Sequence, residues 1–377
     1  MLRITYTLKA DHFLIHRGQV VKEVREPVSE RILELSWDNK KVTAVCECEE
    51  TKTFTLSHPV TFEPDPVEIC EEASFLAEAE VLHIVCKYDV NAFLSVYREE
   101  RLVESGCLKR QSMSFFTVRI QDEKEYVYAD INIKTLEKIL MMHSLPRKRV
   151  NISSVPFVLG RNVVGHIFHE YVHTLERDIC EAEPDLVGIP IFDVAGLTVC
   201  EDPELQTVGH TAFSDEGVKT RKTPLIDNNT VVGFVDSFLY PYHYRSCGYL
   251  GYGKSYFPFP RSVNLHIHGE CEQYDLTDYI EVTELDMELL SLNPLKTKVS
   301  ITGGEGLYIT EGVPSCRVRF NLVWDDTIQK FLSGVSFIDS ETVLPPFGGI
   351  CVKNGILFRS AQTAPPALWK KSAEVRM

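Results

Sequence analysis

The sequence lacks an excess of basic residues: 39 Lys and Arg stand against 54 Asp and Glu, and the formal net charge is −15. Because a nucleic-acid-binding surface must be positive to meet the phosphate backbone, this balance argues against a nucleic-acid partner. One short basic cluster, at 147–149, is better explained as a linker between domains than as a binding site.

Long apolar runs are also missing. No run approaches the roughly 20 residues that a membrane-spanning helix needs, and the first six residues lack the apolar centre of a signal peptide. The 11 cysteines form no C-x-x-C pair and no repeating framework. Cys46 and Cys48 point the same way on an alternating segment, but no second pair completes a metal site. We therefore expect a cytoplasmic chain with reduced cysteines and no membrane partner.

At 377 residues the chain is long enough for two domains, each with its own core. Residues 1–150 are predicted to form a mixed α/β domain that provides architecture, a dimer interface or a partner surface. Alternating segments predict paired strands within 42–56, and 114–133 predicts a hairpin. A Glu-, Ala- and Leu-rich stretch at 69–82 predicts a helix. No catalytic constellation stands out in this half.

Residues 151–377 are predicted to form a β-rich domain, because short strands with turn residues follow residue 181. The glycine clusters at 303–306 and 348–349 predict tight turns. The stretch 249–261 is rich in Gly, Tyr and Pro and predicts an irregular functional loop. The expected fold class is therefore α+β: an N-terminal mixed α/β domain followed by a β-rich C-terminal domain, which the chain enters through the helix described next.

A helix is predicted at 163–178, and it contains the motif H-E-x-x-H. Residues four apart share one face of a helix, so His169 and His173 could hold one metal ion. Glu170 lies one residue further round, close enough to act on water at that metal. Asn162 is predicted as the N-cap. A separate, core-facing stripe consists of Val164, Phe168, Val172, Leu175 and Ile179.

The motif alone does not establish a metal site. A polar stripe can be a solvated helix face, although such faces mostly carry Lys and Glu, whereas this one carries three histidines beside its glutamates. The H-E-x-x-H pattern also arises by chance in unrelated proteins. The rest of the chain must therefore decide.

A catalytic zinc ion needs a third protein ligand and an open position for water. His166 lies on the same stripe, but three ligands along one straight helix would strain a tetrahedral site. Glu176, a turn beyond His173, is better explained as a group that supports a ligand or as a surface carboxylate. The G-x-x-H continuation of the metzincins is absent from the residues that follow. The local sequence therefore leaves the third ligand open.

Eight short segments connect this chain, in a fixed order, with a known family. They lie at 156–159, 165–170, 173–178, 214–220, 225–228, 233–234, 258–264 and 349–355. Together they resemble the TldD/PmbA metallopeptidase family, also called modulator of DNA gyrase. The ordered matches cover about residues 155–365, whereas residues 1–150 match only in general character.

The resemblance implies the missing ligand. The family's third zinc ligand is a cysteine near the C-terminus, and Cys351 is the matching position, in a predicted turn. The implied site is His169, His173 and Cys351 around Zn²⁺, with water in the fourth place. Glu170 is then expected to be the general base.

Arg261 and Asn264 match the family's P-x-P-R-x-x-N segment, and the resemblance implies that they contact substrate. A structural role in a Pro-rich turn is the alternative. One feature departs from the family, because only two residues separate the glutamate from the second histidine, where the family usually has three. The shorter motif would suit a metal-free partner subunit, yet it keeps the four-residue spacing that binds zinc elsewhere.

By this resemblance the chain is expected to be a zinc metallopeptidase that hydrolyses unfolded or flexible peptides, including leader peptides of modified peptide natural products. The family implies a homodimer or a heterodimer with a homologous subunit, in which the 249–261 loop lines an enclosed site. The alternative is a non-catalytic partner subunit, which scaffolds an active homologue or binds a peptide without cutting it.

Overall fold

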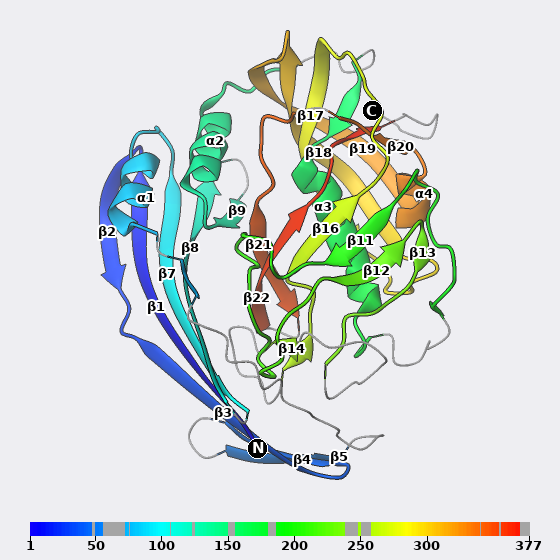
Figure 1. Ribbon diagram of the computed structural model, residues 1–377. Helices are drawn as coiled ribbons and strands as arrows, with labels where there is room; N and C mark the ends of the chain where they lie inside the picture. Colours follow the sequence, from blue (N-terminus) through cyan, green and yellow to red (C-terminus); the bar gives the residue numbers. More distant parts are fainter. Residues whose placement is uncertain are drawn as a thin grey trace.

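The structure is a computed structural model that describes residues 1–46, 50–55, 72–74, 76–105, 107–122, 125–149, 155–179, 186–237, 248–249, 258–339, 341–353 and 356–369. It is a mixed α/β protein built mostly from strands, with few helices (Figure 1). Within these residues no helix combines the length and the apolar character needed to cross a membrane.

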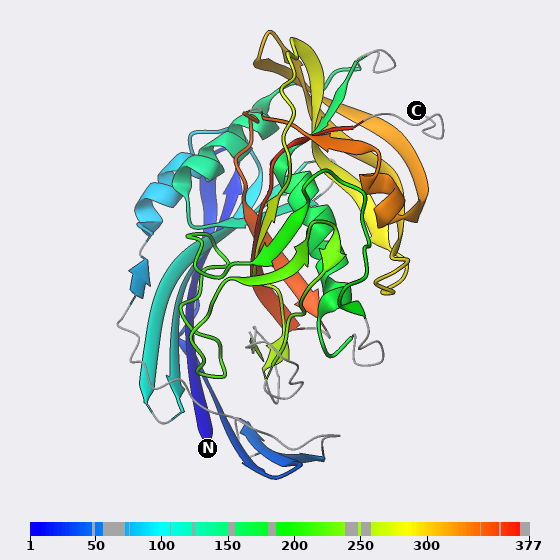
Figure 2. The same ribbon diagram turned by 45° about the vertical axis from the view of Figure 1, so that its right-hand side comes forward.

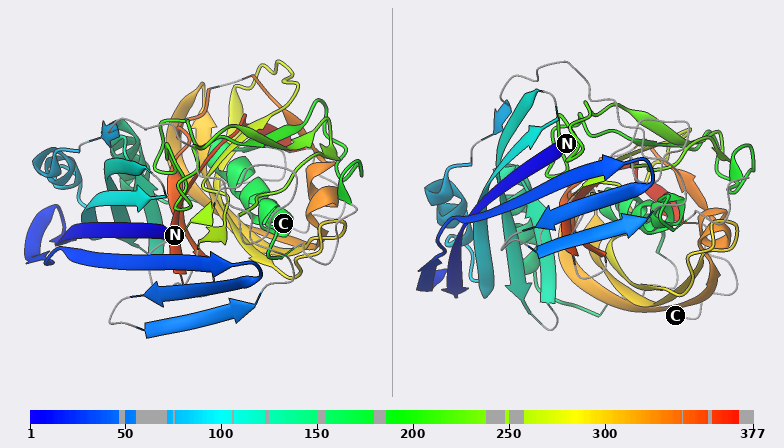
Figure 3. Two further views of the ribbon diagram at one scale, coloured as in Figure 1. Left: turned by 60° about the horizontal axis from the view of Figure 1, so that its bottom comes forward. Right: turned by 90° about the horizontal axis from the view of Figure 1, so that it is seen from below.

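The N-terminal half is a long, mostly antiparallel sheet with two helices on one face. Its elements are β1 (Leu2–His16), β2 (Gln19–Arg25), β3 (Ser29–Asp38), β4 (Lys41–Cys46), β5 (Glu50–Thr55), β6 (Glu72–Ser74), α1 (Glu78–Val85), β7 (Ala92–Glu104), β8 (Leu108–Gln121), β9 (Glu125–Asp130) and α2 (Ile133–Ser144). The two helices lie side by side (Figure 2). The strands β3, β4 and β5 extend away from them along the bottom of the molecule (Figure 3).

Helix α2 covers the sheet because its apolar residues share one face. Leu136, Ile139 and Leu140 are spaced three and one apart along the helix, and all three are fully buried in a cluster with strand residues such as Phe116. Asn132 caps the helix, since its side chain accepts a hydrogen bond from the Lys134 N–H at 2.9 Å.

The C-terminal half encloses one helix between two sheets. Its elements are β10 (Phe157–Leu159), α3 (Arg161–Val172), the 3₁₀ turn η1 (His173–Leu175), β11 (Thr198–Glu201), β12 (Thr223–Asp227), β13 (Thr230–Val231), β14 (Gly248–Tyr249), β15 (Phe259–Pro260), β16 (Asn264–His268), β17 (Asp278–Leu289), β18 (Lys298–Thr310), β19 (Val313–Thr327), α4 (Ile328–Leu332), β20 (Val335–Phe337), β21 (Gly348–Lys353), β22 (Ile356–Thr363) and β23 (Ala367–Trp369). Helix α3 contacts β10 and β17 on one side and β16 and β22 on the other.

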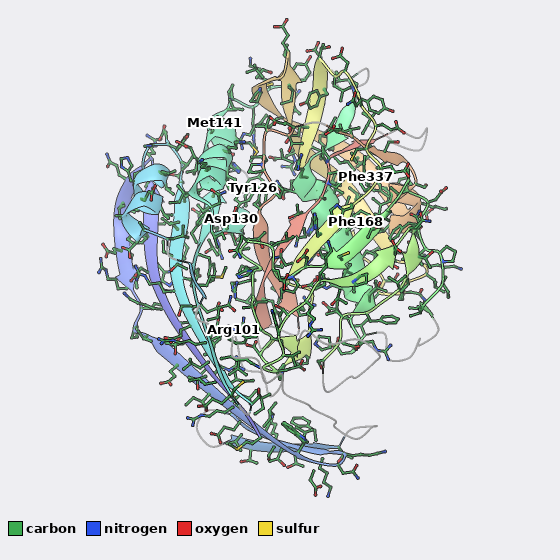
Figure 4. All side chains as sticks on the ribbon, in the orientation of Figure 1. Arg101, Tyr126, Asp130, Met141, Phe168 and Phe337 are labelled. Atoms are coloured by element: carbon green, nitrogen blue, oxygen red, sulfur yellow. The ribbon has the colours of Figure 1, made fainter. Side chains whose placement is uncertain are left out.

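The predicted core stripe is confirmed on α3 and η1, but the helix predicted at 163–178 is wrong in its end, since α3 ends at Val172 and η1 follows. Val164, Phe168, Val172 and Leu175 are fully buried, and Ile179, at the end of the stripe, is half-buried. Phe168, labelled in Figure 4, lies within the C-terminal core. The opposite polar stripe is thereby directed at the site described below.

One large sheet runs through both halves. Its strand order is β13-β12-β11-β16-β22-β21-β9-β8-β7-β1-β3-β4-β5, and β9 meets β21 where Ala129 pairs with Gly348. The second sheet has the order β19-β18-β17-β10-β23-β20. Because the large sheet continues across residue 150, the division into domains 1–150 and 151–377 stays a prediction.

Two local predictions in the N-terminal half have different outcomes. The hairpin at 114–133 is confirmed as β8 and β9, paired from Phe116↔Asp130 to Gln121↔Glu125. The helix predicted at 69–82 is wrong in its start, since 72–74 forms β6 and α1 begins at Glu78. Strand β6 pairs in parallel with β8, so sheet pairing overrides the helical composition of this segment.

The glycine clusters do not form tight turns. Residues 303–306 lie inside β18, and 348–349 begin β21. A Cβ on Gly304 would lie 2.6 Å from the carbonyl oxygen of Glu284 and 2.7 Å from the ring of Phe320. Glycine is needed here because neighbouring groups approach the backbone closely, and not because the chain turns.

Candidate metal centre

Helix α3 starts from a buried strand and is fixed there by its backbone. The N-cap is Gly160, whose N–H donates to the carbonyl oxygen of Val282 at 2.9 Å. A Cβ on Gly160 would lie 2.8 Å from that oxygen. The prediction of Asn162 as N-cap is therefore wrong by two residues. Asn162 lies in the first turn, where its Oδ1 accepts a hydrogen bond from the Phe347 N–H at 3.1 Å.

A second glycine brings α3 close to the strands that carry the third candidate ligand. A Cβ on Gly165 would lie 2.7 Å from Cβ of Gln362 on β22. Strand β22 pairs with β21, where Cys351 stands opposite Phe358. Cys351 therefore lies in a strand and not in the predicted turn, and its distance from α3 depends on this close helix–strand contact.

His169, His173 and Cys351 come together at the end of α3. One ligand atom from each lies within 4.8 Å of the others, and His173 Nε2 is 3.4 Å from Cys351 Sγ. Ligand atoms on one tetrahedral zinc ion are roughly 3.3 to 3.6 Å apart, as its bond lengths require. Nδ1 of His169 is buried and hydrogen-bonds to no described group. Because such a buried nitrogen normally needs a partner, the cluster fits a metal ion.

Glu176 orients His173 from behind. Its carboxylate is fully buried, and Oε1 lies 3.1 Å from His173 Nδ1. A proton on Nδ1, donated to this oxygen, leaves Nε2 free for a metal, as in most metal-binding histidines. Burial lowers the pKa of His173, but Glu176 and the hydrogen bond with Cys351 outweigh it and raise the pKa to about 9 in the metal-free chain, so a metal ion has to displace the proton from Nε2. In contrast, burial and the neighbouring His173 hold the pKa of His169 well below its usual value.

Arg261 links Glu176 to Cys351. Its side chain is 2% exposed, and Nη1 donates to both Glu176 oxygens at 3.0 and 2.8 Å. Nη2 donates to Cys351 Sγ at 2.8 Å, and the guanidinium lies over the Phe358 ring, 5.2 Å from its centroid. One guanidinium thus contacts both the carboxylate that supports His173 and the sulfur of Cys351.

The segment after Arg261 is held by a second buried carboxyl group. Glu201 accepts hydrogen bonds from Ser262 Oγ at 2.6 Å and from the backbone N–H groups of Val263 and Asn264 at 2.9 and 3.0 Å. Burial raises the pKa of Glu201 to about 7, although these three hydrogen bonds lower it. Glu201 therefore fixes the backbone that positions Arg261.

Asn264 is fully buried and bonded within the protein. Its Nδ2 donates to the carbonyl oxygen of Leu205 at 2.9 Å, and its Oδ1 accepts from Thr207 Oγ1 at 2.9 Å. Neither Arg261 nor Asn264 is among the residues that line the cavity described next. Their predicted contact with substrate stays a prediction, and in this structure both side chains serve positioning.

The cluster of His169, His173 and Cys351 opens into a cavity of about 470 Å³. Helix α3 supplies His166 and the half-buried Glu170, and strand β21 supplies 349–352. Strand β9 supplies 125–128, including Tyr126, which is labelled in Figure 4, and β17 supplies Glu284 among others. His166 is exposed and stands outside the three clustered ligands.

Sequence reasoning missed the β9 wall and the pairing of Glu176 with Arg261. Tyr126 and Tyr128 are two apart on a strand and share a face, but no local signal indicates that this face meets α3. Tyr128 OH lies 2.9 Å from Nε2 of His143, which fixes the wall to α2. Residues 250–257 of the predicted loop lie outside the described residues, so its expected place at the site is not described.

The fold and the cluster together define a strand-rich protein with two histidines and one cysteine at a cavity, a donor set suited to a metalloenzyme. Residues 153–372 match the family model of the PmbA/TldA metallopeptidase C-terminal domain. The match covers more than half of the chain, and the chain belongs to the TldD/PmbA metallopeptidase family. A search of curated proteins gave no match.

Solved structures show the same fold. TldE from Thermococcus kodakarensis is 14% identical with a TM-score of 0.67, over 98% of this chain and 95% of that chain. A modulator of DNA gyrase from Thermotoga maritima is 11% identical with a TM-score of 0.63, over 98% of this chain and 94% of that chain. One from Bacteroides thetaiotaomicron is 10% identical with a TM-score of 0.61, over 98% and 92%.

Proposed function

We propose that the chain is a zinc-dependent peptidase that hydrolyses unfolded or flexible peptides, with leader peptides of modified peptide natural products as one such class. The observation that carries this is the convergence of His169, His173 and Cys351 on one point beside Glu170. The buried His169 nitrogen without a described partner gives the cluster a reason to take a metal ion. A His₂Cys donor set with an open fourth position is one that catalytic zinc adopts.

Zinc, when bound, supplies a Lewis acid that polarises a carbonyl and activates water. The other steps belong to the chain. Glu170 stands on the cavity wall beside His169 and takes the proton from the attacking water, then passes it to the leaving amine. Glu176 keeps Nδ1 of His173 as a donor, and Arg261 holds both Glu176 and the cysteine sulfur in place.

The cavity also supports a preference for extended chains. Among the described residues β9 and β21 pair only at Ala129↔Gly348, and beyond that pair both strands line the cavity. The strand segments 125–128 and 349–352 line the cavity, and strands beside a cavity can hydrogen-bond the main chain of an added peptide with little side-chain selectivity. A folded substrate has no free strand to offer, so we expect unfolded peptides to be cut and folded proteins to be spared.

The rival function is a non-catalytic partner subunit, and the shortened motif is the observation in its favour. Helix α3 ends at Val172, and His173 begins the 3₁₀ turn η1. The two rings nevertheless pack edge to face, 4.5 Å between centroids, and His173 reaches Cys351. The shortened motif thus keeps the ligands together, which favours the peptidase. The proposal includes a homodimer or a heterodimer with a homologous subunit, which light scattering of the protein alone and with its homologue tests.

The test compares the parent with Glu170→Gln on one stable globular protein, offered folded and after reduction and unfolding. The parent should cut only the unfolded form. The variant should retain zinc and fold but lose cleavage by roughly 100-fold or more, since an amide cannot take the proton. Glu137→Gln, at an exposed residue of α2 outside the cavity lining, is the matched control and should keep activity. Cleavage by Glu170→Gln at the parent rate would remove Glu170 as the base, and equal digestion of both forms would reject the preference for extended chains.

A further inference from the structure

Strand β16 presents different residues to its two faces. Leu265 and Ile267 are buried in the C-terminal core on the side of α3. Side chains alternate along a strand, so His266 and His268 point to the other face, away from the metal cluster already described. His266 is partly buried and His268 is exposed. A pair of histidines therefore stands on the outside of the sheet.

The two imidazoles are already close enough to share a ligand. Nε2 of His268 lies 3.1 Å from Nδ1 of His266, and the ring centroids are 3.7 Å apart. The same Nδ1 lies 3.9 Å from Oδ2 of Asp202. Asp202 follows β11, and its N–H donates to the carbonyl oxygen of Asn264 at 2.8 Å, which holds it beside β16. Donor atoms on one divalent transition metal are separated by roughly 3.0 to 3.5 Å.

We propose that His266, His268 and Asp202 form a second metal site, for a divalent transition-metal ion such as Zn²⁺. Neutral imidazoles and a carboxylate suit such ions. The histidine pair is preformed. Of the described residues only His169, His173 and Cys351 already place three ligand atoms together, so the Asp202 carboxylate has to turn toward His268 to complete this set. In the absence of metal the contact between the rings is an ordinary N–H···N hydrogen bond. For metal binding the donor ring takes its other neutral tautomer, with the proton on its other nitrogen, so that both facing nitrogens offer lone pairs.

The charged groups around this site have opposite effects on the two histidines. Burial and Lys222 lower the pKa of both His266 and His268, whereas Asp202 raises it. Lys222 Nζ also lies 3.7 Å from Asp202 Oδ2 and competes with the ion for that carboxylate. Cys200 stands opposite His266 in the strand register, but burial raises the pKa of its thiol, so it is left out of the ligand set.

The experiment is a calorimetric titration with Zn²⁺ of protein that already holds one equivalent. We expect a second, weaker equivalent. His268→Gln should weaken it roughly tenfold or more, because one of two imidazoles is lost. Lys222→Gln should strengthen it by up to roughly fivefold, because the competing cation is removed. His83→Gln, which removes an exposed histidine on α1, should change nothing.

Opposite shifts in His268→Gln and Lys222→Gln would establish the site. The absence of a second equivalent, or a second equivalent that both variants leave unchanged, would overturn the proposal. If His83→Gln weakened the second equivalent as much as His268→Gln does, the binding would be nonspecific binding to surface histidines, and the proposal would be overturned. The test is independent of peptidase activity: if the α3 cluster took no zinc, titration of metal-free protein would show one equivalent, sensitive to His268→Gln and insensitive to Cys351→Ser.

Discussion

Replacing Glu176 with Gln tests most sharply whether this buried carboxylate supports the proposed metal site. The change keeps the size of the side chain but removes its charge, and Arg261, 2% exposed, then stays buried without its counter-charge. Removing one partner of a buried ion pair costs about 3–5 kcal/mol. We therefore expect the free energy of unfolding to fall by about that amount, measured by urea denaturation at neutral pH.

The same change should weaken metal binding. The new amide can still face His173, but it no longer fixes the proton on Nδ1 as a carboxylate does, and loss of such a supporting group costs about 10- to 100-fold in metal affinity. Competition with a chelator measures this affinity. The double variant Glu176→Gln/Arg261→Met leaves neither charge buried alone, so its loss of stability should be smaller than the sum of the two single losses.

An exposed ion pair provides the control. Asp326 pairs with Lys330 on the surface, and Asp326→Asn should cost less than about 1 kcal/mol and leave metal affinity unchanged. If Glu176→Gln behaves like Asp326→Asn in both measurements, the buried pair does not support the site and the reasoning is refuted.

Two further predictions concern the packing around the site. Gly165→Ala should lower the free energy of unfolding by about 1–3 kcal/mol and also lower metal affinity, because the added Cβ meets Gln362. Gly349→Ala is the control, since no atom lies within 4 Å of its added Cβ, and it should unfold like the parent. Thermal unfolding compares the two variants. Burial lowers the pKa of His143 to about 3. Below a pH of about 6.5 this histidine is therefore protonated in the unfolded chain but stays neutral in the folded chain. The free energy of unfolding should consequently fall as the pH drops. His143→Gln should therefore lose less stability than the parent between pH 7 and pH 5, and equal losses in urea midpoint would contradict the assignment.

The local parts of the fold and site could be predicted because they depend on short-range periodicity. The core stripe of α3 follows from residues three and four apart, and its burial directs His169 and His173 toward one point. For Glu176 the sequence predicted a position near His173 but did not predict that its carboxylate is buried. Its full burial depends on Arg261, which lies 85 residues away in sequence. No local pattern reports such a pairing.

The third candidate ligand likewise could not be predicted from local sequence patterns. Cys351 lies 178 residues from His173 and reaches it because β22 packs on α3 and pairs with β21. Nothing in composition distinguishes it from the other ten cysteines, so only the family resemblance singled it out. The prediction of tight turns at the glycine clusters was wrong for a related reason. A glycine in the sequence can mark either a tight turn or a close approach of neighbouring groups, as at Gly304, and the local sequence does not distinguish them.

Zinc content of cysteine variants tests the central claim most directly. Cys351→Ser, Cys316→Ser and Cys271→Ser are each made in the His268→Gln background, so that the β16 site does not contribute, and zinc is measured after weakly bound ions are removed. The account predicts one zinc per chain in the Cys316 and Cys271 variants and a much lower content in Cys351→Ser. Equal zinc retention in all three variants would contradict the account, because Cys351 would then lie outside the metal site.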